Sequence, residues 1–271
     1  MTCLTRWLVA TVACAIEDNI VNQTVLIFKG GQGIGKSTFM TNLIPKSLKT
    51  YFYSGNLNPE SKDSVIQLAE TLICMLDELD SLSKYKESSL KEMITKSDIR
   101  IRRPYARYAV KMIRHASLCG SVNHDTILHD PSGSRRYLIQ SVTSIDYTNK
   151  LDMDKVYAQS LHMFKSKYKY WFDGKDIEMI NTENKRYEVQ TIEEELMLKY
   201  FDKTSKDAQG SRKMRATEIL EEVYNNKLPA NAHSAKIRIG VALSKHQFEY
   251  TESNGSKYWW VKQKRFPIDI P

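Results

Sequence analysis

A glycine-rich segment near the start of the chain carries the clearest chemical pattern: residues 30–37 read GGQGIGKS and fit the motif GxxxxGK[ST] in full. Glycines here let successive backbone N–H groups point at phosphate oxygens, and the lysine reaches the β- and γ-phosphates. An apolar run at residues 25–28 precedes the motif, and a helix is expected from Lys36 to about Leu43. This strand–loop–helix context predicts a site for a nucleoside triphosphate. The expected nucleotide ligands are Gly30, Gly31, Gln32, Gly33, Ile34, Gly35, Lys36, Ser37 and Thr38.

Two acids follow a second apolar run. Residues 71–76 predict a buried strand, and Asp77 and Glu78 come directly after it. A carboxylate at the end of a neighbouring strand can hold Mg²⁺ through water, and a second one can polarise the attacking water. We therefore assign Asp77, with the Ser37 hydroxyl, to the metal and Glu78 to the water. The alternative is that both acids begin a solvated helix, where they favour the helix dipole.

Polar residues flank two further predicted strands. Asn123 follows the apolar strand 116–122 and is expected to face the crevice at the carboxyl ends of the strands, where it can orient water or the γ-phosphate. Arg135 and Arg136 precede the apolar run 137–142 and are candidates for an arginine finger, often donated by a neighbouring subunit. The alternatives are a turn-stabilising asparagine and a surface arginine pair. The expected catalytic residues are Lys36, Glu78, Asn123, Arg135 and Arg136.

Positive charge is concentrated in two blocks. The 271 residues carry 40 Lys and Arg against 32 Asp and Glu, a formal net charge of +8. Residues 91–115 hold 8 basic and 2 acidic residues, and residues 203–271 hold 13 and 7, so each block contributes +6. This excess favours a polyanionic partner, although a solvated face without a ligand is the alternative for the first block. The residues expected to contact a nucleic-acid backbone are Lys96, Arg100, Arg102, Arg103 and Arg107.

Cysteine spacing and hydropathy indicate the compartment. The four cysteines show no CxxC or Cys/His metal spacing, which favours buried thiols in a reducing compartment. The apolar stretch 7–16 superficially resembles a signal peptide, but an amphipathic helix over residues 3–16 is the better interpretation. No stretch reaches the ~18 apolar residues needed to cross a bilayer. We therefore expect a cytoplasmic protein without membrane contact.

Strands and helices alternate in the first half of the chain, which is typical of an α/β domain with a parallel sheet. Besides the strands above, a short one is expected at residues 51–53, and helices at residues 61–69 and up to about Ile94. The polar stretch 203–213 is the expected linker. The predicted organisation is a P-loop ATPase domain at residues 1–150, a helical extension at 151–205 and a winged-helix-like basic domain at 206–271.

The C-terminal domain is predicted from its element order. Helices are expected at residues 216–226 and 234–246, and two aromatic strands flank Asn254-Gly255, a strong hairpin signal. Helix, helix and hairpin on a basic background suggest a winged helix in which residues 234–246 form the recognition helix. A protein-docking or regulatory domain is the alternative. The expected contacts to phosphate or base edges are Lys236, Arg238 and Lys245.

Five segments of the chain closely resemble, in the same order, motifs of the virulence-associated protein E family. These segments are GGQGIGKST, LICMLDELD, LKEMITKSDIRIRRPYARY, SVNHD and DPSGSRRYL. This family is a branch of the superfamily 3 and poxvirus-type primase-helicases of bacteria, phages and mobile elements, and the resemblance covers roughly residues 5–200. It implies an AAA+-related ATPase that uses ATP and Mg²⁺, assembles as a ring, with a hexamer favoured, and translocates on DNA. Residues 91–107 resemble the motif whose hairpin contacts single-stranded DNA. The implied roles are Walker A for Lys36 and Ser37, Walker B for Asp77 and Glu78, sensor for Asn123 and finger for Arg135 and Arg136.

Two departures accompany this resemblance. Met75 stands where many relatives carry an acid, and no primase domain fits before the loop, so a separate primase or a longer parent chain is implied. We expect an ATP-hydrolysing DNA helicase or translocase acting in replication of a phage or mobile element, in the cytoplasm of a bacterial host. A small-molecule kinase or a GTPase is the alternative enzyme class. A nucleotide-switched DNA-binding regulator without helicase activity is the alternative outside enzymes.

Overall fold

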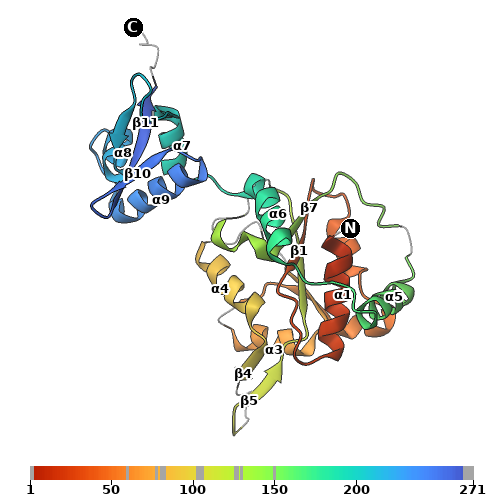
Figure 1. Ribbon diagram of the computed structural model, residues 1–271. Helices are drawn as coiled ribbons and strands as arrows, with labels where there is room; N and C mark the ends of the chain where they lie inside the picture. Colours follow the sequence, from red (N-terminus) through yellow and green to blue (C-terminus); the bar gives the residue numbers. More distant parts are fainter. Residues whose placement is uncertain are drawn as a thin grey trace. The chain divides into compact units, whose positions relative to one another are not determined.

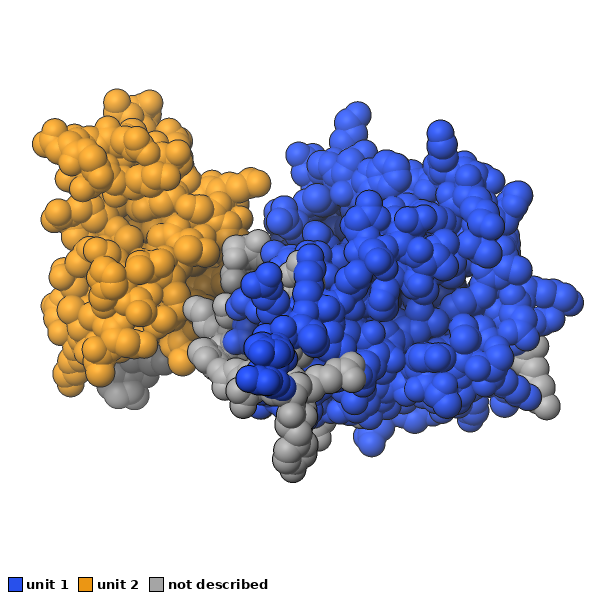
Figure 2. Space-filling view, turned by 90° about the horizontal axis from the view of Figure 1, so that it is seen from below, with its two compact units in different colours: residues 1–189 blue, residues 190–271 orange. Residues whose placement is uncertain are grey.

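The computed structural model describes residues 3–58, 61–76, 79, 84–101, 107–124, 128, 131–148 and 151–264 (Figure 1). The chain divides into two compact units, Met1–Val189 and Gln190–Pro271 (Figure 2). This boundary differs from the predicted ones at 150/151 and 205/206. The predicted helical extension is shared between the two units, and the predicted linker 203–213 contributes strand residues to the second unit.

The first unit is built on a five-stranded parallel sheet with the order β2-β3-β6-β1-β7. Val25 of β1 lies opposite Leu118 of β6 on one side and Tyr137 of β7 on the other. The sequence-based prediction of an α/β domain with a parallel sheet is confirmed. The strand bounds are β1 Val25–Lys29, β2 Phe52–Gly55, β3 Ile73–Leu76, β6 Ser117–Val122 and β7 Tyr137–Ser141.

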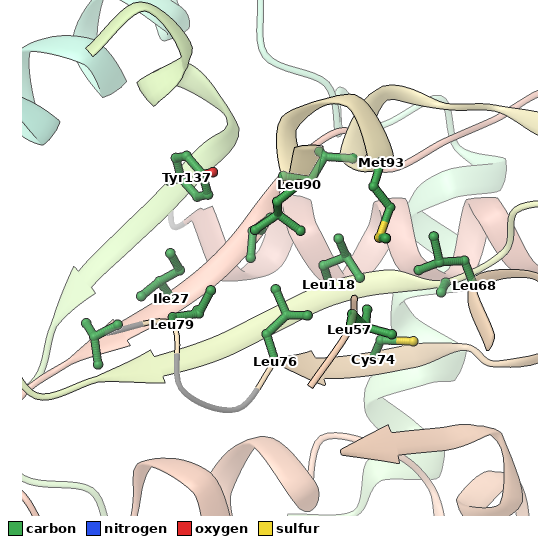
Figure 3. Close-up of a cluster of buried hydrophobic side chains, with 14 of the residues drawn as sticks. Ile27, Leu57, Leu68, Cys74, Leu76, Leu79, Leu90, Met93, Leu118 and Tyr137 are labelled. Atoms are coloured by element: carbon green, nitrogen blue, oxygen red, sulfur yellow. The ribbon is translucent and has the colours of Figure 1, made fainter. Parts of the chain in front are cut away.

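Both faces of this sheet are buried, because apolar side chains occupy the first four positions of the central strand β1. In β1, Val25 and Ile27 enter the core on one face, and Leu26 and Phe28 enter the core on the other. Successive strand residues point to opposite faces, so a continuous apolar run is what a doubly covered strand requires. Figure 3 shows the first of these cores, where Ile27 of β1 lies with side chains of neighbouring strands and helices.

Helices cover the two faces of the sheet. Helices α3 and α4 supply side chains to the core of Figure 3, whereas α1, α2 and α5 pack on the opposite core. The N-terminal helix spans the predicted residues 3–16, but α2 ends at Thr41, earlier than expected. The bounds are α1 Cys3–Ile16, α2 Lys36–Thr41, α3 Lys62–Glu70, α4 Lys84–Thr95, α5 Met153–Lys165 and α6 Gly174–Asn184, with 3₁₀ turns η1 Lys46–Tyr51, η3 Pro131–Arg136 and η4 Lys185–Tyr187.

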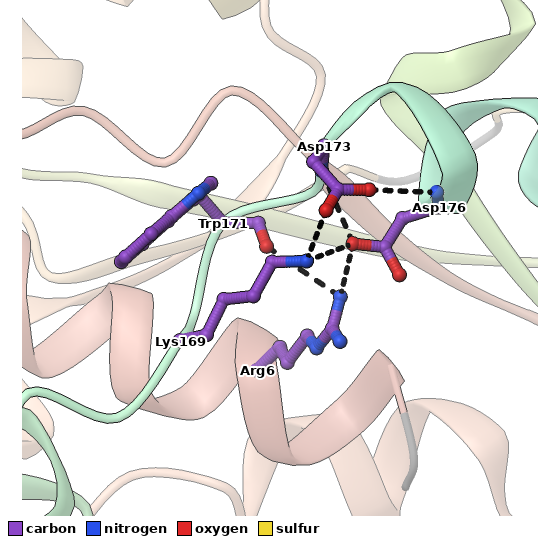
Figure 4. Close-up of polar contacts among 5 residues, drawn as sticks. All are labelled: Arg6, Lys169, Trp171, Asp173 and Asp176. Atoms are coloured by element: carbon purple, nitrogen blue, oxygen red, sulfur yellow. Dashed lines mark hydrogen bonds and ion pairs between the residues drawn. The ribbon is translucent and has the colours of Figure 1, made fainter.

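An ion-pair network fixes the start of α6 on α1 (Figure 4). Arg6 of α1 lies 2.9 Å from Asp176, and Lys169 lies 2.6 Å from Asp173 and 2.7 Å from Asp176. Asp173 and Asp176 also form a capping box, in which each side chain accepts a hydrogen bond from the backbone N–H of the other. The bonds from Lys169 and Arg6 hold the pKa of Asp176 far below its usual value. Helix α6 is therefore held in place at its first turn.

Two more strands form a separate antiparallel ribbon, which projects from the first unit (Figure 1). The ribbon pairs β4 (Asp98–Ile101) with β5 (Val110–Ile113). Ile99 is buried, and Met112 packs against the same core, so the inner face of the ribbon anchors it to the domain. Because β5 leads directly into β6, the ribbon leaves the sheet at the edge where the strands begin.

The second unit packs three helices on an antiparallel sheet. Its element order is helix, two short strands, two helices and a hairpin, and Trp259 lies in its core with 3% of its surface exposed. Asn254 and Gly255 have φ of 49° and 70°, which confirms the predicted hairpin turn. The bounds are α7 Ile192–Tyr200, β8 Phe201–Lys203, β9 Arg212–Met214, α8 Ala216–Val223, α9 Ala232–Lys245, β10 Tyr250–Ser253 and β11 Ser256–Gln263.

Two further expectations concern the whole chain. Three of the four cysteines are buried, Cys3 is half-buried, and all four are free thiols, as expected. Burial raises the pKa of Cys14 and of Cys74 to about 11, so these thiols are inert. In the part of the chain that the structure describes, no helix has both the length and the apolar composition needed to cross a membrane.

Candidate nucleotide site

The glycine-rich loop begins between two strands that hold both of its sides. The Gly30 N–H donates to the Val122 carbonyl at 3.2 Å, and the Val142 N–H donates to the Lys29 carbonyl at 2.8 Å. A Cβ on Gly30 would lie 2.2 Å from the Val142 carbonyl oxygen, so only glycine fits there. Gly35 has a φ of 91°, a left-handed conformation that side chains disfavour. Both glycines are therefore required by the loop, as the motif predicts.

Lys36 and Asn123 meet at the mouth of this loop. The Lys36 Nζ donates to the carbonyls of Gly30 at 2.7 Å and Gly31 at 2.6 Å, and to Asn123 Oδ1 at 2.9 Å. Lys36 is 6% exposed, whereas Asn123 is exposed. The structure thus brings together two residues that the sequence predicted separately.

Hydroxyl groups lie beside this lysine. Ser37 and Thr38 are exposed, and the Ser37 Oγ lies 3.4 Å from the Ser121 Oγ. The Ser121 hydroxyl was not predicted, because a serine inside a strand carries no motif. Asp77 and Glu78 lie outside the described residues, and within the described part no cluster of His, Cys, Asp or Glu could hold a metal ion. The Ser37 hydroxyl is therefore the one predicted Mg²⁺ ligand that the structure describes.

The strand that precedes Asp77 is not the neighbour of the loop strand. Strand β6 lies between β1 and β3, so the prediction of an acid on an adjacent strand is wrong in this detail. Asn123, at the end of β6, is instead the polar residue that follows the adjacent strand. The carboxyl ends of all three strands still meet at one edge of the sheet, because β1, β6 and β3 are parallel.

The paired arginines lie at the opposite edge of the sheet from the loop. Tyr137, which follows Arg136, pairs with Val25 at the start of β1, and Ser141 pairs with Lys29 at its end. At ~3.3 Å per strand residue, the length of β7 alone separates the arginines from the loop by about 13 Å. The end of one strand and the start of the next lie at opposite edges of a parallel sheet, so the pair lies about one strand length from the loop of its own chain. Its role as an arginine finger, often donated by a neighbouring subunit, stays a prediction.

Helix α6 fixes the backbone around these arginines. Asn184 is 2% exposed, and its Nδ2 donates to the carbonyls of Ser134 at 2.8 Å and Tyr137 at 2.9 Å. These two carbonyls flank the pair, of which Arg135 is exposed and Arg136 half-buried. Sequence reasoning missed Asn184, because its partners lie far away in the chain and no motif links them.

The basic ribbon presents charge on its outer face. Arg100 and Lys111 are register partners across the two strands, and both are exposed. The Arg107 guanidinium lies 5.5 Å from the ring centre of Tyr108, which is 69% exposed. Sequence reasoning did not single out Lys111 or Tyr108.

The other predicted contacts of this block have different outcomes. Lys96 lies at the end of α4 and forms an ion pair of 2.7 Å with Glu92, which lowers the pKa of that carboxyl. Arg102 and Arg103 lie outside the described residues. Of the predicted set, Arg100 therefore lies on the ribbon, and Arg107 lies in the segment that leads into β5.

In the second unit, two of three predicted contact residues have internal partners. Arg238 forms two hydrogen bonds of 2.7 and 2.6 Å with Glu193, and Lys245 lies 3.0 Å from Glu194. Both carboxylates are about 5% exposed, so these pairs join α7 to α9. Lys236 lines a groove along α9, as do Lys245 itself and the half-exposed Ile237.

The parallel sheet and the glycine-rich loop at its carboxyl edge define a P-loop-like α/β protein. The model of a family described as the virulence-associated protein E-like domain matches residues 1–189. The chain belongs to this family, as its motifs predicted.

Solved structures that match this chain include apo structures of the NrS-1 C-terminal region. One is 15% identical with a TM-score of 0.46, and the match covers 97% of this chain and 70% of that one. Another, an A form, is 14% identical with a TM-score of 0.42, covering 95% and 71%. A search of curated proteins found no match.

Proposed function

We propose that this protein hydrolyses ATP to move on DNA, in the replication of a phage or mobile element. The contact of Lys36 with Asn123 at 2.9 Å carries this proposal, because it combines a phosphate-binding lysine with a polar group that can sense the γ-phosphate. Family membership supports it independently. The helicase interpretation extends the proposal from hydrolysis to strand separation.

The residues present fit ATP with Mg²⁺. The amide groups of the loop would bind the phosphate oxygens, and Lys36 would exchange its carbonyl contacts for the β- and γ-phosphates. The Ser37 hydroxyl, with Asp77, would hold Mg²⁺, which supplies charge neutralisation at the phosphates. Glu78 would accept a proton from the attacking water, and Asn123 would orient that water or the γ-phosphate.

Hydrolysis by this proposal requires a second copy of the chain. Arg135 and Arg136 lie at the edge of the sheet opposite the loop, so neither is placed to serve the phosphates of its own chain. Their charge can reach a γ-phosphate when one subunit presents this edge to the loop of the next. Such a head-to-tail contact closes into a ring when the rotation permits it, and a hexamer is the family expectation.

The ribbon is the proposed contact for single-stranded DNA. Arg100 faces Lys111 across the two strands, and both side chains are exposed, so both can contact a phosphate backbone. The exposed Tyr108 ring offers a base a stacking surface. This set of charges and an aromatic ring is what sequence-independent binding of single strands uses.

For the second unit we propose a winged helix. Its order of helix, two short strands, two helices and hairpin supports this proposal, with α9 as recognition helix. Lys236 and Lys257 line the groove beside α9, whereas Arg238 and Lys245 stabilise the unit through α7. Replacing Lys236 and Lys257 with Ala should weaken binding to duplex DNA in a shift assay at low salt. Unchanged binding would favour a protein-docking role for α9.

A coupled ATPase assay with and without single-stranded DNA, beside a strand-displacement assay, tests the proposed function. Lys36→Ala should abolish hydrolysis and weaken ATP binding, since the charge at the β- and γ-phosphates is lost. Glu78→Gln should keep ATP bound without turnover. Exposed Lys175 of α6 provides a control of equal charge, and Lys175→Ala should leave both readings unchanged. ATP binding without turnover by the native chain would favour the nucleotide-switched regulator.

Mixing two inactive variants tests whether hydrolysis requires an arginine from a second copy of the chain. Lys36→Ala subunits keep their arginines, and Arg136→Ala subunits keep their loops, so a mixed assembly contains some complete sites. Part of the activity should return on mixing, and specific activity should rise with protein concentration. A mixture that stays inactive while assemblies form contradicts the role of the neighbour's arginine. If Arg135→Ala is the inactive variant instead, only the choice of arginine changes.

One sequence feature favours GTP as a second candidate. Residues 149–152 read NKLD, the NKxD order that reads guanine in GTPases. Asn149 and Lys150 lie outside the described residues, whereas Asp152 caps α5, where its side chain accepts a hydrogen bond from the Lys155 N–H at 3.3 Å. The hydrolysis assay should therefore include GTP. Faster turnover of GTP than of ATP would replace ATP in the proposal.

A further inference from the structure

A cavity lies beside the glycine-rich loop, between α2, η1 and the start of α5. Its volume is about 860 Å³, within the ~300–1,000 Å³ that small-molecule sites occupy. Half of the lining residues are polar or charged: Asn42, Lys46, Lys49, Asp146, Thr148, Asp152 and Asp154. The apolar wall includes Phe39, Leu43, Pro45, Tyr147, Leu151 and Met153. We call this space the side cavity.

Tyr147 connects the side cavity to the loop. A Cβ on Gly35 would lie 2.1 Å from Tyr147 Cδ1, so the tyrosine ring packs directly against the backbone of the residue before Lys36. The same ring lines the side cavity and is 46% exposed. A large aromatic surface is therefore available within one residue of the phosphate-binding lysine.

The backbone on both sides of Tyr147 is ordered by local hydrogen bonds. Its N–H donates to the Ile145 carbonyl at 3.0 Å. The N–H and hydroxyl of Thr148 donate to Asp146 Oδ1 at 3.2 and 2.7 Å. These bonds order the backbone that carries the ring, so less backbone freedom is lost when a ligand packs on the ring.

We propose that the side cavity receives the base and ribose of the nucleotide, and that Tyr147 stacks on a purine base. This proposal rests on the proposed binding of a nucleoside triphosphate by the loop. Phosphates held at Gly35 and Lys36 leave the nucleoside beside the loop, where the described structure offers an aromatic ring and a cavity large enough to hold it. A base stacks on an aromatic ring through its π-face, and a purine offers more stacking area than a pyrimidine.

Calorimetric titration of the full chain tests this proposal with three ligands. They are a non-hydrolysable ATP analogue, the corresponding CTP analogue and tripolyphosphate, which has no base. The ATP analogue should bind more tightly than the other two. Tyr147→Ala should weaken its binding about ten-fold, in the range of base–aromatic stacking, and leave tripolyphosphate unchanged. Tyr147→Phe keeps the ring and should bind like the native chain.

Tyr51→Ala is the matched control, because Tyr51 is 50% exposed but does not line the side cavity. It should change none of the three affinities. If Tyr147→Ala weakens tripolyphosphate as much as the ATP analogue, the ring supports the loop and the proposal is overturned. The same holds if the ATP analogue binds no more tightly than tripolyphosphate. If none of the three ligands binds the native chain, the proposed nucleotide function fails together with the role of Tyr147. Failure of the proposed function is thereby distinguished from failure of the stacking proposal alone.

Discussion

Arg114 provides a direct test of how the ribbon is joined to the sheet. It lies between β5 and β6, is 1% exposed, and donates hydrogen bonds to main-chain carbonyls rather than to an acid. The Nη2 donates to Asn22 at 3.1 Å, and the Nη1 donates to Met93 at 3.1 Å and also to Ile94. The Nε donates to Ala116 at 3.3 Å. One side chain thus joins the end of α4, the segment before β1 and the start of β6.

The cost of removing this side chain follows from those contacts. Four buried carbonyls would lose a donor, at about 1–3 kcal/mol each. Removing the charge offsets part of that cost: burial lowers the pKa of Arg114 to about 10 from an ordinary value of 12.5, which corresponds to roughly 3 kcal/mol. The difference is about 1–9 kcal/mol, and water that enters the vacated space can satisfy some of the carbonyls. We therefore expect Arg114→Ala to reduce the free energy of unfolding of the first unit by a value in the lower part of this range, about 3 kcal/mol.

Native-state hydrogen exchange of the full chain measures this effect by region. Peptides from α4 and β6 should open about 3 kcal/mol more easily in Arg114→Ala, whereas peptides from α9 should not change. Arg186 is an exposed control, paired with Glu183 at 3.0 Å, and Arg186→Ala should cost under about 1 kcal/mol. If Arg114→Ala leaves β6 as protected as in the native chain, the carbonyl contacts do not hold the ribbon to the sheet.

Three further predictions concern other contacts. Asn184→Ala should leave ATP affinity unchanged and lower the hydrolysis rate at saturating ATP, because the backbone around Arg136 loses two hydrogen bonds. An equal loss of ATP affinity and of hydrolysis rate would contradict a positioning role for Asn184. Arg238 holds the pKa of Glu193 below its usual value of ~4.3, so this pair stabilises the second unit fully above that pH and loses its effect as pH falls through the lowered pKa. Glu193→Gln should flatten that acid dependence in α7 peptides. Replacing Arg100 and Lys111 with Ala should reduce the salt slope of single-stranded DNA binding by about one unit per lost contact, and an unchanged slope would exclude the ribbon as the contact.

The phosphate loop was predictable because its determinants are local. The glycines, Lys36 and Ser37 lie within one short segment, and their spacing alone specifies the turn. Asn123 was predictable from a simple rule, since the carboxyl ends of parallel strands gather at one edge. The sheet followed from apolar runs of strand length, because strands buried on both faces carry no polar alternation.

Long-range pairing explains what the sequence did not predict. Residues 203–213 are polar, which predicts a linker, yet Lys203 and Arg212 pair with Val261 of β11. Asn184 and Tyr147 act on backbone that is distant in the chain, so no local pattern marks them. The arginine pair follows Asn123 closely in sequence, but it comes just before β7, whereas Asn123 comes just after β6. Because β7 and β6 both run parallel to β1, the start of β7 lies at the edge of the sheet opposite to the end of β6.

The ribbon and the arginines lie at the same edge of the sheet, and this has a consequence for how DNA would stimulate hydrolysis. Strand β6 joins the ribbon to Asn123, but it is paired on both sides, by β1 and β3, so sliding it would break two ladders at once. A stimulus from the ribbon is therefore expected to act on the arginines of its own subunit, and through them on the loop of the next subunit.

Two mixed assemblies distinguish the route through the arginines from a route through β6. In the first mixture, the Lys36→Ala subunits keep the ribbon, and the Arg136→Ala subunits also carry Arg100→Ala and Lys111→Ala. DNA should stimulate ATP hydrolysis by this mixture. The reverse placement, with the ribbon changes on the Lys36→Ala subunits, should hydrolyse ATP without stimulation. Equal stimulation of both mixtures would refute the route through the arginines, and the opposite order would place the coupling in β6.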